Sequence, residues 1–282
     1  MDNAMERVKQ LIDLALREDI GQGDYTTLSC IPENAKGRSQ LLVKEPGVLA
    51  GVEVAAKVFD AFDPGVKFSV FLPDGSRVQP GDIAFEVEGK VRSLLQCERL
   101  ALNFMQRMSG IATRTAFYVS LIEGSGARIL DTRKTTPNMR ILEKMAVKIG
   151  GGENHRMGLY DMVMIKDNHV DFAGGIVKAI EQAHNYLRTH NLNIQIEVEV
   201  RNMEELQQVL GYGHVNRIML DNFSIKDLSA AVRLIDKQYE TEASGGITED
   251  TIRQVAYTGV DYISVGALTH HVKSLDLSLK AI

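Results

Sequence analysis

The chain has 282 residues, of which 44% are hydrophobic and 24% are charged, and its formal net charge at pH 7 is −5. This composition is that of a globular protein with a real core, long enough for one large domain or two modest ones. The negative balance gives no reason to expect nucleic acid or an anionic membrane as a partner. Any site for an anion must therefore be a local cluster of cations.

The two cysteines, Cys30 and Cys97, form no CxxC pattern and have no zinc-like spacing. So few thiols in a chain of this size indicate reduced, intracellular cysteines rather than a disulfide framework. The first ten residues are charged and lack the apolar core of a signal peptide, and no stretch approaches the ~18 apolar residues of a membrane span. We therefore expect a cytoplasmic protein.

The first third of the chain predicts a helix followed by a small antiparallel β unit. Residues 4–17 carry apolar side chains at helical spacing, and short β-rich runs separated by Pro-Gly and Asp-Gly turns follow at 39–43, 67–71 and 83–87. Apolar residues three or four apart from Leu94 to Ile111 predict a long helix. We place the domains at 1–112 and 113–282, with the last residues returning to the first domain.

The second part alternates short apolar runs with helical segments. The runs are 129–131, 162–166, 194–199, 218–221, 239–244 and 262–266, and the helical segments are 176–189, 203–210, 225–236 and 249–256. Strands that alternate with helices predict a parallel sheet, and this many units in so short a stretch favours a closed or nearly closed barrel. In such barrels the functional groups lie where the strands end.

Cations gather between residues 131 and 169, at predicted strand ends and in loops. They are Arg133, Lys134, His155, Arg156 and Lys166. Arginine binds carboxylates in a bidentate manner and lysine adds a compact charge. A lone Arg or Lys is usually a surface ion pair, but this cluster predicts a pocket for a small, multiply charged anion. Arg140, Lys144 and Lys148 share one face of the following helix, which we interpret as solvated.

Carboxylates and glycine turns end the later strands. Glu197 and Glu199 face the same way, and Asp221 ends a later strand, which suggests a Mg²⁺ site that also takes substrate phosphates. A buried ion pair with Lys166 or Arg133 is the alternative. The glycine turns at 244–246 and 266–267 stand where α/β barrels often bind phosphate.

These motifs, in this order, resemble quinolinate phosphoribosyltransferase. They are TRKT at 132–135, GGGENHR at 150–156, IKDNH at 165–169, EVE at 197–199, LDNF at 220–223, SGG at 244–246 and VGALTH at 265–270. The resemblance implies an N-terminal α/β sandwich domain followed by an incomplete, TIM-like α/β barrel. It also implies a homodimer with shared sites, and a reaction that joins quinolinate to phosphoribosyl diphosphate with loss of CO₂ and pyrophosphate, giving nicotinate mononucleotide for NAD biosynthesis.

The same resemblance implies a role for each motif. Thr132, Arg133, Lys134, His155 and Arg156 would bind quinolinate, and Arg99 would enter from the partner subunit. Lys166 would lie near ribose and pyrophosphate, and Glu199 and Asp221, the former preferred over Glu197, at the ribose and Mg²⁺. The turns formed by Ser244, Gly245, Gly246, Gly266 and Ala267 would hold the 5′-phosphate.

Three alternatives remain open on the residues alone. One is a phosphoribosyltransferase of the same fold that acts on another acid, such as nicotinate. A second is a barrel aldolase that uses Lys166 as a Schiff-base amine. The third is an anion sensor without catalysis, against which the carboxylates of Glu199 and Asp221 argue.

Overall fold

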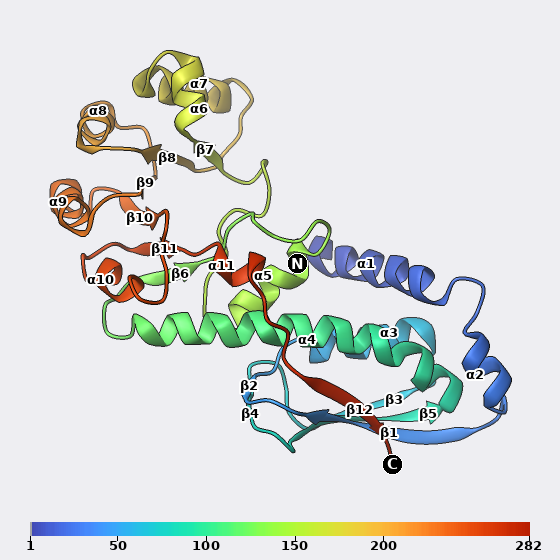
Figure 1. Cartoon of the computed structure of the whole chain (residues 1–282). Helices are drawn as coiled ribbons and strands as arrows, with labels where there is room; N and C mark the ends of the chain where they lie inside the picture. The colour runs from blue at the N-terminus through green and yellow to red at the C-terminus, as the bar shows by residue number, and fades with distance from the viewer. Residues whose placement is uncertain (1) are drawn as a thin grey trace. The chain divides into compact units, whose positions relative to one another are not determined.

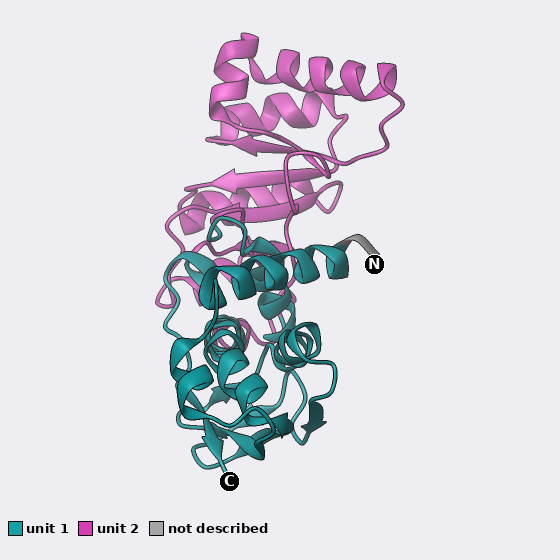
Figure 2. Cartoon of the chain, turned by 90° about the vertical axis from the view of Figure 1, so that its right-hand side faces the viewer, with its two compact units in different colours: residues 1–116, 135–151, 267–282 teal, residues 117–134, 152–266 magenta. Residues whose placement is uncertain are grey.

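The computed structural model describes residues 2–282, which divide into two compact units (Figure 2). Unit 1 combines the chain up to residue 116 with residues 135–151 and 267–282, and unit 2 combines residues 117–134 and 152–266. Unit 1 thus gathers three separate stretches of sequence. None of the helices within residues 2–282 combines the length and the apolar composition that a membrane-spanning helix needs.

Unit 1 is built on an antiparallel sheet with strand order β12-β1-β5-β3 (Figure 1). Its strands are β1 (Lys36–Val43), β3 (Lys67–Val70), β5 (Ile83–Lys90) and β12 (Leu277–Ala281). The three short runs expected in the N-terminal third are confirmed as β1, β3 and β5. The last strand, β12, pairs with β1 from Ser39–Ala281 to Val43–Leu277, so the C-terminal residues complete this sheet.

Helices cover the sheet and supply most of the apolar core of unit 1. Val58 and Phe59 on α3 (Val52–Phe62), Phe85 on β5 and Met105 on α4 (Val91–Leu121) are all buried. Burying side chains of this size is the main stabilising contribution to such a core. The remaining elements of the unit are α1 (Asp2–Ile20), α2 (Tyr25–Cys30), β2 (Gly47–Val48), β4 (Arg77–Val78), α5 (Arg140–Ile149) and α11 (Ala267–His270).

Helix α5 departs from the interpretation of its basic face as solvated. Lys148 is exposed, but Lys144 is fully buried and Arg140 is partly covered. The neighbouring Glu143 is also buried, and its Oε1 forms an ion pair with Nη2 of Arg107 at 2.5 Å. The interpretation is wrong for Lys144 because α5 is enclosed within unit 1, where it contacts α1, instead of lying on an open surface.

Unit 2 contains a parallel sheet of 6 strands in the order β6-β11-β10-β9-β8-β7. The strands are β6 (Arg128–Leu130), β7 (Val163–Ile165), β8 (Ile196–Val200), β9 (Arg217–Asp221), β10 (Glu240–Ser244) and β11 (Tyr262–Ser264). The helices between them are α6 (Asp167–Ala173), α7 (Ile176–Thr189), α8 (Met203–Tyr212), α9 (Ile225–Ile235) and α10 (Ile252–Ala256). This confirms the predicted alternation, and α6 is an addition to it.

The strand order is that of a barrel, because β6, the first strand of the series, pairs in parallel with β11, the last. Beyond β6, a single parallel bridge joins Leu130 to Glu153, so a short extended segment takes the next place. Among the described residues, the pairing recorded for β7 is with β8 alone. The expected incomplete α/β barrel is confirmed, with its carboxyl strand ends gathered at one rim.

Candidate active site at the barrel rim

Lys166 and Glu199 form an ion pair at the ends of two neighbouring strands. Lys166 follows β7 directly, and Glu199 is the fourth residue of β8, which pairs with β7 in parallel. The Lys166 ammonium contacts Oε2 of Glu199, and the side chains are 41% and 8% exposed. The pairing anticipated as an alternative to a metal site is therefore present, with the lysine facing outward and the glutamate mostly covered.

The backbone of Lys166 is fixed by the motif that follows it. Helix α6 begins at Asp167, and Nδ1 of His169 accepts a hydrogen bond from the Lys166 amide at 2.9 Å. Asp167 accepts from the Asn168 amide at 2.7 Å. These bonds satisfy amides that a helix start leaves unpaired. His169 and Asn168 thus set the geometry of the loop that carries Lys166.

Asp221 ends β9 and is oriented by the residue that follows it. The Asn222 side-chain amide donates to Oδ2 of Asp221 at 2.6 Å, and the Asn222 backbone amide donates to the Ser244 carbonyl at 2.9 Å. Asn222 has a φ of 56° and Gly245 a φ of 92°. A Cβ on Gly245 would overlap Oδ1 of Asn222. The glycine turn after β10 therefore leaves room for the side chain that orients Asp221.

Arg133 and Arg156 are two cations of unit 2 that lie near enough for their charges to interact. Arg133 and Lys134 lie exposed after β6, where Oγ1 of Thr132 accepts from the Lys134 amide at 3.0 Å. Arg156 is partly covered, and its Nη1 donates to the Met162 carbonyl at 3.3 Å. Burial and the charge of Arg133 lower the pKa of Arg156. Two like charges that repel each other in this way favour an anion beside them.

His155 lies beneath this cationic edge in a buried cluster of charged groups. Its Nε2 is 2.9 Å from Oε2 of Glu197 and 3.2 Å from Oε2 of Glu242. Arg217 contacts the same oxygen of Glu242 at 3.3 Å. Asp131, fully buried, accepts from the His155 amide at 2.9 Å. The imidazole is therefore held on several sides inside the barrel.

The charges of this cluster influence one another strongly. Burial and the neighbouring Glu242 raise the pKa of Glu197 to about 7. Burial opposes ionisation of Glu242 as well, but hydrogen bonding with His155 holds the pKa of Glu242 below its ordinary value. Burial alone would lower the pKa of His155, and the two glutamates reverse this and raise it. Charged groups survive here because each has an opposite charge beside it.

Known proteins match this chain along nearly its whole length. Residues 24–109 match the family described as "Quinolinate phosphoribosyl transferase, N-terminal domain", and residues 111–280 match the C-terminal domain of that description. The chain belongs to the quinolinate phosphoribosyltransferase family.

Individual relatives agree with this. The chain is 46% identical to "Nicotinate-nucleotide pyrophosphorylase [carboxylating], chloroplastic" of Arabidopsis thaliana, over 97% of this chain and 82% of the relative. It is 40% identical to the probable enzyme of that name in Bacillus subtilis, over 97% of this chain and 93% of the relative. The crystal structure of NadC from Streptococcus pyogenes superposes with a TM-score of 0.92 at 42% identity, covering 98% of this chain and 97% of that one.

More distant structures share the fold only. The human nicotinic acid phosphoribosyltransferase superposes with a TM-score of 0.63 at 13% identity, covering 91% of this chain and 72% of that one. At this level of identity a shared barrel says nothing about the acid that is used. The choice between acids therefore depends on the side chains at the rim.

The sites expected for a quinolinate phosphoribosyltransferase fall mostly in unit 2. Every expected residue from Thr132 to Gly266 belongs to that unit, whereas Arg99, exposed on α4, and Ala267, at the start of α11, belong to unit 1. Within unit 2 the structure joins Lys166 to Glu199 and Asp221 to the Ser244 turn, and Arg133 lies near enough to Arg156 for their charges to interact. Ser244 and Asp221 are partners in the strand register.

Sequence reasoning missed Glu242 and Arg217, and it preferred Glu199 over Glu197 without giving Glu197 a role. A pattern could have found Glu242. It precedes Ser244 by two residues, as Glu197 precedes Glu199, so in each strand the earlier residue lies one layer deeper on the same face. Arg217 has no such signal, because it opens its strand and reads as a boundary residue.

The expected Mg²⁺ ligands suit an open metal site, in which substrate and water complete the coordination, rather than a site closed by protein ligands alone. Glu199 and Asp221 offer carboxylate oxygens on adjacent strands, the donors that Mg²⁺ prefers. Among the described residues, the three metal-type ligands that come within 4.8 Å of one another are His155, Glu197 and Glu242 instead. That buried group already has Arg217 as its counter-ion. Glu199 and Asp221 fit a Mg²⁺ ion that draws its other ligands from substrate phosphates and water.

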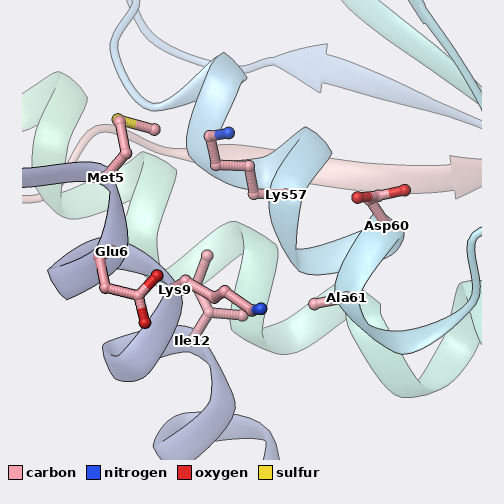
Figure 3. A pocket seen from close by; sticks show the side chains of 7 residues that line it. All are labelled: Met5, Glu6, Lys9, Ile12, Lys57, Asp60 and Ala61. Atoms are coloured by element: carbon pink, nitrogen blue, oxygen red, sulfur yellow. The ribbon is translucent and has the colours of Figure 1, made fainter. Parts of the chain in front are cut away.

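Two surface hollows in unit 1 contain none of the expected site residues. One, of about 420 Å³, lies between α1 and α3, where Glu6 and Lys9 face Lys57 and Asp60 (Figure 3). The other, of about 470 Å³, lies along the sheet beside Lys36, Lys67 and Lys90. The first has balanced charges, and both lie open to solvent, so neither competes with the barrel rim as a catalytic site.

Proposed function

We propose that this chain transfers the 5-phosphoribosyl group of phosphoribosyl diphosphate to the ring nitrogen of quinolinate. Pyrophosphate leaves from C1 of the ribose, the 2-carboxylate leaves as CO₂, and nicotinate mononucleotide remains for NAD biosynthesis. The observation that supports this best is the division of one rim into two chemistries. Cations cluster at Arg133 and Arg156, and carboxylates with a lysine lie at Glu199, Asp221 and Lys166.

The cationic half suits a planar dicarboxylate. Arg133 and Arg156 offer two guanidinium forks, and Lys134 adds a third cation in the same loop. Charge-assisted hydrogen bonds of this kind contribute roughly 1.5–3 kcal/mol each when sheltered. Thr132 holds the loop through its bond to the Lys134 amide. The backbone contacts of His155 set the place of Arg156 in this half.

The carboxylate half suits the phosphoribosyl donor. Departure of pyrophosphate leaves positive charge on the ribose, which Glu199 and Asp221 stabilise, while the Lys166 ammonium stabilises the leaving group. Mg²⁺, when bound with the donor, would neutralise its phosphates. The turn of Ser244, Gly245 and Gly246, with Gly266 and Ala267, would receive the 5′-phosphate through backbone amides.

The remaining chemistry needs position more than reactive groups. No protein nucleophile is required, because the ring nitrogen of quinolinate attacks C1 of the ribose. Once that nitrogen carries the ribose, its positive charge stabilises the carbanion formed at C2 when CO₂ leaves, and this carbanion then takes up a proton from solvent. The protein holds the two reactants in register, which by itself removes a large part of the barrier.

We further propose a homodimer in which Arg99 enters the site of the partner subunit. Its guanidinium is exposed on α4, as such a role requires. Cys30 and Cys97 are both free thiols, which agrees with a reducing compartment such as the cytoplasm.

One rival acts through Lys166 as a Schiff-base amine, and its geometry is unfavourable. Schiff-base chemistry needs an amine that is free to attack a carbonyl carbon, whereas the Lys166 amine contacts the Glu199 carboxylate and would have to leave that partner. The other rival is a phosphoribosyltransferase for another acid. An acid such as nicotinate has fewer carboxylates than quinolinate to bind Arg133, Lys134 and Arg156.

The test is product analysis with purified protein. Quinolinate with phosphoribosyl diphosphate and Mg²⁺ should release pyrophosphate and CO₂ in equal amounts, and chelation of Mg²⁺ by EDTA should stop the release. Nicotinate should give much slower pyrophosphate release and no CO₂. Turnover of nicotinate, or of another acid, in place of quinolinate would refute the proposal.

A further inference from the structure

We propose that His155 is a positioning residue whose ring does not bind quinolinate, and that Glu197 and Glu242 act through it to hold the backbone of Arg156. This deepens the proposed function and rests on it, since it assigns the binding of the carboxylates to the guanidinium of Arg156. The inference comes from what each ring nitrogen of His155 contacts.

Both ring nitrogens of His155 lie against groups of the protein, Nδ1 through a hydrogen bond and Nε2 through close charge contacts. Nδ1 accepts a hydrogen bond from the Arg156 amide at 2.6 Å. Nε2 lies between the Glu197 and Glu242 carboxylates, at 2.9 and 3.2 Å. The side chain is 4% exposed. A substrate carboxylate would have to displace one of these partners, and it would then meet two glutamates of its own charge.

The contact with Arg156 fixes where the ring carries its proton. A nitrogen that accepts from an N–H group needs its lone pair, so Nδ1 has no proton. At 2.6 Å there is no room for two hydrogens between the two nitrogens. The proton of the ring is therefore on Nε2, where it faces the two carboxylates. These carboxylates raise the pKa of His155, but a second proton on Nδ1 would displace the Arg156 amide, so the contact with Arg156 opposes that rise and keeps the ring neutral. Glu197 and Glu242 select this form, and the form makes Nδ1 an acceptor.

The carboxylates are themselves held from below. Arg217 contacts Glu242 at 3.3 Å and Glu240 at 2.9 Å, and its guanidinium lies 4.1 Å from the ring centre of Tyr262. Arg217 is also the register partner of Glu197 on the adjacent strand. The path from Arg217 through the glutamates to His155 and the Arg156 amide is thus a continuous set of contacts within unit 2.

The same arrangement occurs a second time at the rim. Nδ1 of His169 accepts a hydrogen bond from the backbone amide of Lys166, the cation that follows β7. In both cases an imidazole nitrogen accepts a hydrogen bond from the backbone amide of a cationic residue. Arg156 is therefore held at two places: its backbone amide donates to Nδ1 of His155, and its Nη1 donates to the Met162 carbonyl.

Two variants of His155 separate the two ring nitrogens. In His155→Asn the amide oxygen takes the place of Nδ1 and keeps an acceptor for Arg156, but the contact with the glutamates is lost. In His155→Gln the amide nitrogen takes the place of Nε2 and keeps that contact, but the acceptor is lost. We expect His155→Asn to be the less stable protein with a KM for quinolinate within about threefold of wild type. His155→Gln should be the more stable, with that KM raised at least about tenfold.

The KM for phosphoribosyl diphosphate should stay within about twofold in both variants, since the donor half is untouched. Asn and Gln at the exposed His190, the C-cap residue of α7, serve as matched controls and should change neither constant. Equal increases of the quinolinate KM in both His155 variants would overturn the proposal, because a ring that binds quinolinate directly would be lost in both. So would a similar rise in the KM for the donor.

Glu197→Gln tests the support from below. The amide oxygen of glutamine can stay beside Nε2 in the place of the carboxylate oxygen, so we expect the quinolinate KM to change by less than about threefold. Glu197→Leu removes the acceptor and should raise it at least about tenfold. If His155 bound quinolinate as a cation, loss of the negative charge in Glu197→Gln would weaken binding nearly as much as Glu197→Leu, and that result would overturn the proposal.

Nitrogen NMR of the ligand-free protein gives a readout that does not depend on activity. Long-range proton–nitrogen spectra of ¹⁵N-histidine protein, assigned with His155→Gln, should show a proton on Nε2 and none on Nδ1 of His155 near pH 7. A proton on Nδ1 overturns the inference whether or not the protein converts quinolinate. Conversely, failure to convert quinolinate with the expected spectrum would refute the proposed function alone.

Discussion

The ammonium of Lys166 contacts the carboxylate of Glu199 across the ends of β7 and β8, and the two side chains differ widely in solvent exposure. Lys166 is 41% exposed in its side chain, whereas Glu199 is 8% exposed. The lysine is thus available to a ligand, while the glutamate depends on the lysine to balance a charge that water scarcely reaches. Activity and stability should therefore respond differently when the pair is broken.

Replacement of Lys166 by methionine should remove the group that stabilises the leaving pyrophosphate and also strand Glu199. We expect kcat to fall by at least about 100-fold and the free energy of unfolding to fall by roughly 1–2 kcal/mol. The double variant Lys166→Met/Glu199→Gln should regain most of the stability but none of the activity. Urea unfolding and initial rates measure the two effects. Lys226→Met, on the exposed start of α9, is the control and should alter neither. Recovery of activity in the double variant would contradict the role of Lys166.

A second prediction concerns the turn after β10. Gly245→Ala places a Cβ against Oδ1 of Asn222 and demands a φ of 92° from alanine. Because Asn222 orients Asp221, the KM for the phosphoribosyl donor should rise about tenfold or more, with a loss of about 2 kcal/mol in stability. Gly126→Ala is a matched control: its φ is 83°, but the space around it is open. It should lose about 1 kcal/mol and leave the KM unchanged. Equal effects on the KM would show that backbone strain, not Asn222, is responsible.

The two cysteines should differ widely in reactivity. Burial, with the nearby charge of Asp63, raises the pKa of the Cys97 thiol to about 12. Only the thiolate reacts with iodoacetamide, so at pH 8 Cys97 should be alkylated at least about a thousandfold more slowly than a free thiol. Cys30 is exposed and should react within minutes. Peptide mass spectrometry over time measures both sites. Comparable rates at Cys97 and Cys30 in the folded protein would contradict the burial of Cys97.

The rim of the barrel could be predicted from sequence, and the layer beneath it could not. Alternation along β8 places Glu197 and Glu199 on one face, and polar residues that end apolar runs indicate the rim. The partner of each charge depends on which strands lie side by side. Glu242 comes from β10 and His155 from an extended segment, so their meeting with Glu197 follows from the closed order of strands, not from local spacing. The prediction that Lys144 is solvated was wrong for the same reason. Helical spacing identifies which residues share a face, but only packing determines what covers that face.

The last prediction tests whether sites are shared between subunits. If Arg99 serves the partner's site, Arg99→Ala and Lys166→Ala are each inactive as homodimers, because every site lacks one group. In a mixed dimer, one site receives Arg99 from the Lys166→Ala subunit and Lys166 from the Arg99→Ala subunit, and it is complete. Random exchange at equal amounts should restore about a quarter of the wild-type activity, since half of the dimers are mixed and each has one complete site. Exchange is followed with differently tagged subunits, and Lys166→Ala mixed with Lys166→Ala/Lys226→Met controls for exchange without complementation, because no site in that mixture has Lys166. Mixed dimers that form but stay inactive would place Arg99 outside the partner's site.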